Sequence, residues 1–334
     1  MEYVIGIDGG GTKTTAAVIR EDLGRAGSAT TGPANYRSVG MEAASANIAN
    51  AVLAALRAAD VTLSEVRAIC MCLAGFDTDL DLPVPQRAMQ LLNYNGVAIM
   101  ENDVVGAWSG ATEAGPGIVV IAGTGSTGLG MNARGQLWRT DGWDYILGDY
   151  GSAYAIGHEA IRTAMKALDG RIAPTRLALA LRDAYGVTDA ESMRRLVDST
   201  SFGKVEISAF AAHVSRAADA GDSTAQDLLA RAGQDLGDQA SAIIQHLHMG
   251  DDAFPISTVG SVFKSTPWVT DPFYHGIRLL APRAVFRPPL HAPEVGAAIL
   301  ALRRLRDNDT GSWTLGTGSR HIQRSLRIDE LGLP

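Results

Sequence analysis

A glycine-rich turn directly after Asp8 carries the first residues able to do chemistry. Because glycine has no Cβ, the backbone N–H groups of such a turn approach an anion closely. Thr12 adds a hydroxyl donor and Lys13 a positive charge, and Asp8 is placed to hold Mg²⁺ through water. The turn is not a Walker A loop, which requires Ser or Thr directly after Gly-Lys. We predict that Gly10, Gly11, Thr12 and Lys13 hold a phosphate; the alternative is a plain hairpin turn.

A second glycine-rich turn runs from Gly123 to Gly128 and matches the Gly-x-Gly-x-x-Gly fingerprint of dinucleotide-binding proteins. That fingerprint requires a helix directly after it, whereas Leu129 to Gly135 predicts a strand and a turn, so we reject NAD binding. Two strand–turn–strand segments instead predict two lobes that each close on one side of a phosphate chain. In the second turn the phosphate-binding candidates are Gly123, Thr124 and Gly125.

Two aspartates and a tryptophan are candidates for work on a substrate. Asp103 follows an apolar run and precedes a helical segment, so it is either a general base on a hydroxyl or a helix N-cap. Asp149 could equally cap the helix that begins after Gly151. Trp143 is either a core residue or, beside polar groups, an apolar face for a sugar ring. Spacing alone leaves these alternatives open.

The elements that must position these residues follow a repeated order. Apolar runs predict strands at 3–8, 14–20, 66–73 and 97–100, with a further strand at 25–31, and periodicity predicts helices at 41–59, 85–92 and 104–111. The pattern restarts with strands at 117–122, 127–132 and 136–139. Helices at 151–168, 175–185, 207–220 and 224–246, a strand at 256–259 and a helix at 294–306 follow, with Asp222 or Ser223 as a cap. The order indicates an α/β fold.

Length and composition set the class of protein. With 334 residues, we expect two domains: an N-terminal lobe of residues 1–115 with a returning helix at 294–307, and a C-terminal lobe of residues 116–293, with 308–334 as a tail extension. The net charge of −7 argues against a nucleic-acid partner. With no long apolar run and no signal peptide, we expect no membrane partner and a cytoplasmic protein.

The cysteines and two histidines give little sign of a metal site. The two cysteines of the chain, Cys70 and Cys72, point to the same face of a predicted strand and are expected to be buried and reduced. His246 and His248 do not share a helix face, so we do not expect them to form a metal site.

Together these segments resemble the BadF/BadG-type ATPase family, and within it the N-acetylglucosamine kinases, in order through roughly residues 3–305. The most specific part is Gly-Trp followed by Gly-Asp-x-Gly-Ser-Ala-Tyr. The segments that carry the resemblance are Gly6–Thr14, Gly32–Tyr36, Leu73–Gly75, Asn102-Asp103, Ala122–Ser126, Gly142-Trp143, Gly148–Tyr154, Val259–Lys264 and Glu294–Ala298.

The resemblance implies an actin-like (ribonuclease H-like) two-lobed ATPase fold with a mixed sheet in each lobe, and the use of ATP with Mg²⁺. It implies that Thr12 and Thr124 contact the phosphates and that Gly260 and Ser261 lie near the adenosine. It also implies that Asp103 is the base on the 6-hydroxyl of a hexosamine. The residues implied to surround the hexosamine, with Asp103, are Asn35, Gly142, Trp143, Asp144 and Asp149.

The activity implied is phosphorylation of the 6-hydroxyl of N-acetyl-D-glucosamine. Glucosamine and N-acetylmuramic acid stay open, because one wall of a pocket decides which substituent fits. A non-catalytic sugar sensor and the activator ATPase of a 2-hydroxyacyl-CoA dehydratase are further alternatives, the latter disfavoured by the two buried cysteines. Tyr150 stands where relatives often carry Glu, which leaves a contact there open. A homodimer is an expectation from the family alone.

Overall fold

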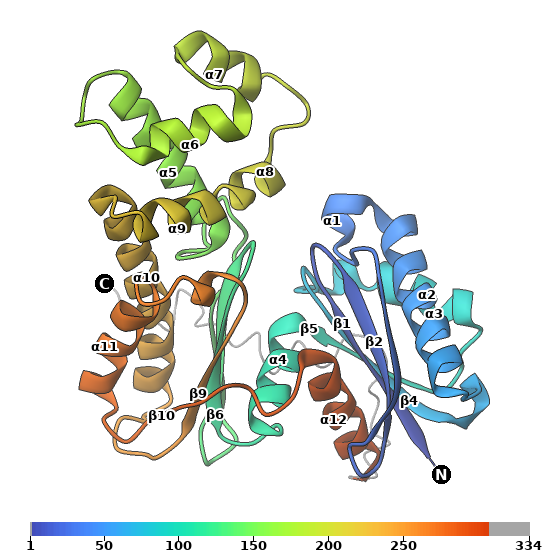
Figure 1. Ribbon diagram of the computed structural model, residues 1–334. Coiled ribbons are helices and arrows are strands. Elements are labelled where there is room, and N and C mark those ends of the chain that lie inside the picture. The colour runs from blue at the N-terminus through green and yellow to red at the C-terminus, as the bar shows by residue number, and fades with distance from the viewer. Residues whose placement is uncertain (1, 307–334) are drawn as a thin grey trace, which may run out of the picture. The chain divides into compact units, whose positions relative to one another are not determined.

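The computed structural model describes residues 2–306, and the predicted tail extension lies outside them. The chain forms two compact units (Figure 1). The first contains residues 2–119, 129–139 and 286–306, and the second contains residues 120–128 and 140–285. The lobe boundaries predicted at residues 115 and 293 stay predictions.

The first unit is built on a five-stranded mixed sheet in the order β3-β2-β1-β4-β5. Strands β1, β2 and β3 are antiparallel neighbours, whereas β4 runs parallel to β1 and β5 parallel to β4. The register pairs Gly9 with Thr14, so the first glycine turn (residues 9–13) closes the β1–β2 hairpin. The strands are β1 (Tyr3–Gly9), β2 (Thr14–Arg20), β3 (Arg25–Thr31), β4 (Val66–Leu73) and β5 (Val97–Asn102).

Helices cover both faces of this sheet, which explains why β1 and β4 are apolar along nearly their whole length (Figure 1). Helix α2 packs on β2 and β3, and α12 packs on β1 and β4. Cys70 and Cys72 lie on β4 and are buried, as predicted, with their Sγ atoms 4.0 Å apart. The helices of this unit are α1 (Tyr36–Val39), α2 (Met41–Ala59), α3 (Pro83–Leu92), α4 (Asp103–Thr112) and α12 (Pro293–Arg306).

Helices α4 and α12 pack backbone against backbone. A Cβ built on Gly296 of α12 would lie 2.0 Å from the carbonyl oxygen of Gly106 and 2.3 Å from the backbone nitrogen of Gly110, both on α4. The Ser109 hydroxyl of α4 donates a 2.8 Å hydrogen bond to the Gly296 carbonyl. Glycine is therefore required at Gly296 by the close approach of the two helices.

The second sheet has the order β10-β9-β6-β7-β8. When it is counted from β8, three strands consecutive in the chain are followed by two later strands, which is the order of the first sheet. This repeat confirms the prediction of a mixed sheet in each half of the chain. The strands are β6 (Gly117–Ala122), β7 (Ser126–Met131), β8 (Leu137–Asp141), β9 (Pro255–Val259) and β10 (Val285–Phe286).

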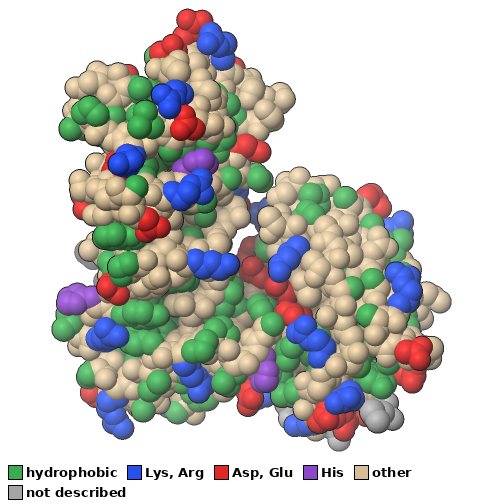
Figure 2. Space-filling model, viewed as in Figure 1, with side chains coloured by type: hydrophobic (Ala, Val, Ile, Leu, Met, Phe, Trp, Pro, Cys, Tyr) green, Lys and Arg blue, Asp and Glu red, His purple; other side chains and the backbone are tan. Residues whose placement is uncertain are grey.

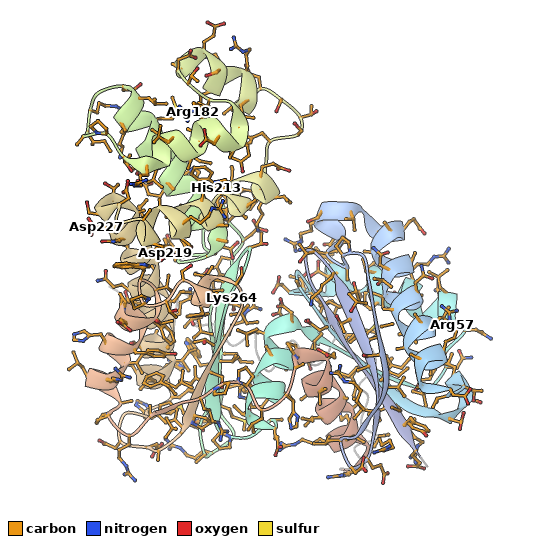
Figure 3. All side chains as sticks on the ribbon, viewed as in Figure 1. Arg57, Arg182, His213, Asp219, Asp227 and Lys264 are labelled. Atoms are coloured by element: carbon orange, nitrogen blue, oxygen red, sulfur yellow. The ribbon has the colours of Figure 1, made fainter. Side chains whose placement is uncertain are left out.

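The helices of the second unit agree with the predicted ones except in three places. The helix predicted over 207–220 is two helices, which meet at the buried Phe210. Phe210 keeps helical backbone angles and stacks on His213, the α9 residue that is labelled in Figure 3, so the apolar spacing does not reveal the break. Helices α7 and α11 were not predicted. The helices are α5 (Ala153–Leu168), α6 (Arg176–Tyr185), α7 (Ala190–Val197), α8 (Lys204–Ala209), α9 (Ala211–Asp219), α10 (Ser223–His246) and α11 (Thr270–Leu280).

Two general properties bear on the expected partners. On the face drawn in Figure 2, Lys and Arg side chains are interspersed with acidic and hydrophobic ones. None of the helices in the described part of the chain has both the length and the apolar character needed to cross a bilayer.

Candidate active site

The first glycine turn is held by its backbone, which leaves its tip open. The N–H of Gly10 donates to the carbonyl of Lys13 at 2.9 Å, and the Gly10 carbonyl accepts the N–H of Ala34 at 3.1 Å. A Cβ on Gly11 would meet nothing within 4 Å. Thr12 and Lys13 are exposed. The predicted phosphate-binding residues therefore lie together in one open turn, in which Gly11, Thr12 and Lys13 are exposed and the Gly10 N–H is used within the turn.

Asn35 lies beside this turn. Its N–H donates to the Gly10 carbonyl at 3.4 Å, and its side-chain oxygen accepts the N–H of Arg37 at 3.1 Å, which caps the short helix α1. A Cβ on Gly75 would lie 3.4 Å from the Asn35 side-chain oxygen. The Ala74 N–H donates to the Gly9 carbonyl at 2.8 Å. Backbone bonds thus gather segments 9–13, 34–35 and 74–75 at one end of the first sheet.

Asp103 is not the N-cap of α4, so that alternative is wrong. Asn102 is the cap: its side-chain oxygen accepts the Val104 N–H at 3.1 Å, and Asp103 is the first helical residue. Burial raises the pKa of Asp103 to about 6. Arg139 opposes this rise, whereas Asp77 adds to it. Capping therefore does not explain Asp103, although the backbone N–H groups of Asp103 and Val104 favour its ionised form and lower its pKa.

The charged neighbours of Asp103 are tied to its helix. Arg139 Nη1 donates to Asp77 Oδ1 at 2.8 Å, and the Asn102 side-chain amide donates to the same oxygen at 3.0 Å. Asp77 therefore holds Arg139 next to the residue that caps α4. No residue spacing indicates that Arg139 contacts Asp77 and Asn102, because the three come from separate segments.

Asp8 lies at the end of β1 among other carboxylates. Burial raises the pKa of Asp8 to about 7, with Asp103 and Glu294 adding to the rise and Lys13 opposing it. Crowded carboxylates beside a phosphate turn suit a divalent cation. The described residues contain no group of three or more His, Cys, Asp or Glu side chains that could hold a metal ion. Asp8 would therefore hold Mg²⁺ through water, with water and phosphate oxygens as the ligands of the ion.

The second glycine turn (residues 123–128) is held in the second unit. The N–H of Gly123 donates to the Gly125 carbonyl at 2.9 Å, and the Gly123 carbonyl accepts the N–H of Ala153 at 2.8 Å. A Cβ on Gly260, whose φ is +115°, would lie 2.1 Å from the Ala122 carbonyl oxygen. Gly260 must therefore be glycine, and it lies against Ala122, directly before this turn. The placement of Gly260 and Ser261 near the adenosine stays a prediction.

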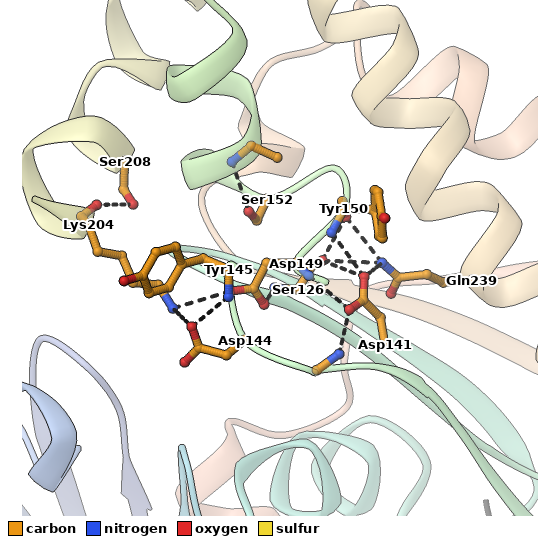
Figure 4. Close-up of polar contacts among 12 residues, drawn as sticks. Ser126, Asp141, Asp144, Tyr145, Asp149, Tyr150, Ser152, Lys204, Ser208 and Gln239 are labelled. Atoms are coloured by element: carbon orange, nitrogen blue, oxygen red, sulfur yellow. Dashed lines mark hydrogen bonds and ion pairs between the residues drawn. The ribbon is translucent and has the colours of Figure 1, made fainter. Parts of the chain in front are cut away.

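Asp141, which was not predicted, organises the segment that we call the Trp143 loop (residues 141–152). Its carboxylate accepts the backbone N–H groups of Gly142 at 2.7 Å, Asp149 at 2.8 Å and Tyr150 at 2.9 Å (Figure 4). The side-chain amide of Gln239 on α10 donates to it at 3.0 Å. The one sequence signal for Asp141 is its position directly before Gly142, which is typical of a turn. No signal in the sequence indicates its contact with Gln239.

Asp149 is not a helix cap either, which corrects that alternative. Ser152 caps α5 by accepting the Ala155 N–H at 3.1 Å. The Asp149 carboxylate instead accepts the Ser126 N–H of the second glycine turn at 3.0 Å. Burial raises the pKa of Asp149, and the Ser126 N–H and Lys204 oppose this rise. Asp149 thus connects the Trp143 loop to the second glycine turn.

Three further residues of the Trp143 loop have exposed or partly exposed side chains. Trp143 is 61% exposed, so the alternative of a core tryptophan is wrong. Asp144 is partly exposed and has a φ of +69°. At Tyr150 the side chain is exposed while its carbonyl accepts the Ser126 hydroxyl at 2.7 Å. The loop therefore combines a fixed backbone with an aromatic face and carboxylates that a polar ligand can reach.

The two sheets of matching strand order, each with a glycine turn after its first strand, define an α/β protein of the actin-like ATPase class. The chain belongs to the BadF/BadG/BcrA/BcrD ATPase family, whose model matches residues 5–301.

Three known proteins are similar to this chain in sequence or structure. An N-acetylmuramic acid/N-acetylglucosamine kinase from Clostridium acetobutylicum is 31% identical over 90% of this chain and 98% of its own length. An N-acetyl-D-glucosamine kinase from Dictyostelium discoideum is 30% identical, with the same coverage. The structure of a protein from Chromobacterium violaceum, described as a putative N-acetylglucosamine kinase, is 27% identical, with a TM-score of 0.73 over 90% of this chain and 99% of that one.

Proposed function

We propose that this protein transfers the γ-phosphoryl group of ATP to the 6-hydroxyl of an amino sugar, with N-acetyl-D-glucosamine as the preferred acceptor. The observation that carries the proposal is Asp103, a carboxylate that neither caps its helix nor lies at the open surface. The names of the two relatives that are at least 30% identical support the choice of sugar.

Asp103 acts as the general base in this proposal. A base works best when its pKa lies near the operating pH, and burial brings the pKa of Asp103 to about 6. At neutral pH the carboxylate is then mostly ionised and takes the proton of the 6-hydroxyl as that oxygen attacks phosphorus. Its fixed place at the start of α4 lowers the entropy cost of aligning the hydroxyl.

The two glycine turns hold the nucleotide. Backbone N–H groups at Gly11 and Gly125, with the hydroxyls of Thr12 and Thr124 and the Lys13 ammonium, bind phosphate oxygens and neutralise their charge. Gly10 and Gly123 shape the two turns, because their N–H groups donate to the carbonyls of Lys13 and Gly125. Gly260 and Ser261 bind the adenosine. When bound, Mg²⁺ offsets phosphate charge, and Asp8 holds it through water.

The residues that the family resemblance implies for the sugar have separate roles in this proposal. Asn35 and the backbone of Gly142 bind hydroxyls, the exposed face of Trp143 stacks on the ring, and Asp144 and Asp149 accept hydroxyl protons in hydrogen bonds. A cytoplasmic location and a homodimer remain predictions from the sequence.

A substrate panel tests this function. We expect purified protein with ATP and Mg²⁺ to release ADP with N-acetylglucosamine, and we expect mass spectrometry to find the 6-phosphate. Glucosamine and N-acetylmuramic acid are run beside it, because N-acetylmuramic acid is named in the Clostridium relative. Absence of sugar-dependent ADP release with all three sugars would refute the proposal and favour a sugar sensor.

The activator-ATPase alternative is not favoured. It needs cysteines that hold an iron–sulfur cluster at a subunit interface, whereas both cysteines of this chain are buried within β4. A colourless protein with sugar-dependent ADP release would exclude it.

The pH profile of kcat/KM gives a prediction for Arg139. Asp103 must be deprotonated to act, so activity should rise with pH through about 6. Arg139 favours the ionised form of Asp103, so Arg139→Gln raises the pKa of Asp103. The acidic limb of the profile, where kcat/KM rises with pH, then moves to higher pH by about one unit. The exposed Arg134 lies on the turn between β7 and β8, and Arg134→Gln is the control that should leave the limb in place. An acidic limb at the same pH in Arg139→Gln as in the wild type would contradict the effect of Arg139 on the pKa of Asp103.

A further inference from the structure

Lys204, the first residue of α8, lies against the Trp143 loop from a distant part of the chain. Its Nζ is 3.2 Å from Asp149 Oδ2 and 3.6 Å from Asp144 Oδ1. The same ammonium lies 4.8 Å from the centre of the Tyr145 ring (Figure 4). Three residues of the loop thus converge on one cation that neither the sequence nor the family resemblance assigned.

The backbone of Lys204 is fixed independently of these contacts. The Glu206 carboxylate accepts the N–H of Gly203 at 2.9 Å, and the Ser208 hydroxyl donates to the Lys204 carbonyl at 2.6 Å. Helix α8 lies against α5, where a Cβ on Gly157 would fall 1.9 Å from the Ile207 carbonyl oxygen. Because α5 begins directly after the Trp143 loop, α8 holds Lys204 at a set place beside that loop.

The exposures of the three charged side chains show what Lys204 does there. Asp149 is buried, with 6% of its side chain exposed, whereas the side chains of Lys204 and Asp144 are 31% and 42% exposed. A buried carboxylate is poorly hydrated, so its contact with Lys204 matters more than a surface ion pair does. The group carries two negative charges and one positive charge, and it stays open to a ligand on the sides of Lys204 and Asp144.

The candidate acceptor sugars differ in charge at neutral pH. N-acetylglucosamine is neutral, glucosamine carries an ammonium group and N-acetylmuramic acid carries a carboxylate. With Lys204 present, the net charge of the group is −1; without it, the net charge is −2. A change of one unit charge within a partly enclosed site alters the relative binding of these sugars, in opposite directions for the cation and the anion.

We propose that Lys204 is a specificity-determining residue of the sugar site, which offsets part of the charge of Asp144 and Asp149 and so weakens the binding of the cationic free amino sugar relative to the neutral N-acetylated sugar. The inference rests on the proposed sugar kinase function. Discrimination then comes from the repulsion between Lys204 and a substrate ammonium as well as from hydrogen bonds to the carboxylates.

The test is the kcat/KM of Lys204→Met for the three sugars. Methionine keeps a stem of similar length over Tyr145 and removes the charge. We expect the ratio of glucosamine to N-acetylglucosamine to rise about tenfold, mainly through KM, and the ratio of N-acetylmuramic acid to N-acetylglucosamine to fall by a similar factor. Lys204→Arg, which retains the charge, should keep the ratios near those of the wild type.

Lys166→Met is the matched control. Lys166 lies on α5 of the same unit and pairs with Glu159 at 3.9 Å, away from the Trp143 loop. Its ratios should equal those of the wild type. Lys204→Gln replaces Lys204→Met if the latter does not fold. Ratios that stay within twofold of the wild type would overturn the inference, including the case in which kcat/KM falls by the same factor for all three sugars. A wild type inactive on every sugar would instead overturn the proposed function.

Discussion

Replacing Asp103 by Asn is expected to lower kcat for sugar phosphorylation by about 10²-fold or more, while ATP binding is retained. The two side chains have nearly the same shape, but the amide cannot take the proton of the attacking hydroxyl. Helix α4 should persist in the variant, because its cap is Asn102 and not Asp103. The loss is therefore expected in the chemical step rather than in folding.

Single-turnover kinetics and equilibrium nucleotide binding separate these effects. Asp60→Asn is a suitable control, because Asp60 is exposed at the left-handed C-terminal position of α2, where asparagine is well tolerated. That control should match the wild type in both measurements. Near-normal turnover in Asp103→Asn would exclude Asp103 as the base, and a parallel loss of ATP binding would indicate a structural role instead.

The strands and their glycine turns were predictable because the signals are local. The strand at 66–73 was predicted with the bounds that β4 has, since an apolar run on a sheet covered on both faces is continuous. Asp222 was one of two predicted caps, and its carboxylate does accept the Ala225 N–H at 2.9 Å. Helix α11 was missed because it contains Pro272 and Gly276, which weaken the helical pattern and are tolerated through tertiary packing.

The candidate site likewise contains residues that local sequence signals reveal and residues that only the tertiary fold reveals. The glycine turns and the Gly142–Tyr154 block were visible because their residues are contiguous. Whether Asn102 or Asp103 is the cap, however, depends on which side chain accepts the Val104 N–H. The sequence does not decide this, because Asn and Asp are both favoured at the N-cap. Lys204 and Gln239 reach the Trp143 loop only through tertiary folding. The sequence holds no spacing that would indicate them.

The packing of α4 on α12 leads to the largest expected loss of stability. In Gly296→Ala, the added Cβ would lie 2.0 Å from the Gly106 carbonyl oxygen and 2.3 Å from the Gly110 nitrogen. These are backbone atoms of a helix, which cannot turn aside as a flexible side chain can, so α12 must move away from α4. Overpacking of this kind costs about 3 kcal/mol. It would also weaken the 2.8 Å bond from Ser109 to the Gly296 carbonyl.

Gly276→Ala is the matched control, because it is also a glycine-to-alanine change inside a helix. A Cβ on Gly276 of α11 would meet nothing within 4 Å, so this change should be neutral or stabilise the protein by up to about 1 kcal/mol through helix propensity. Amide hydrogen exchange reports each region separately. We expect α4, α12 and β1 to exchange faster in Gly296→Ala and not in Gly276→Ala, because α12 packs directly on β1 and α4. Equal protection of these elements in the two variants would show that the helices can separate at little cost.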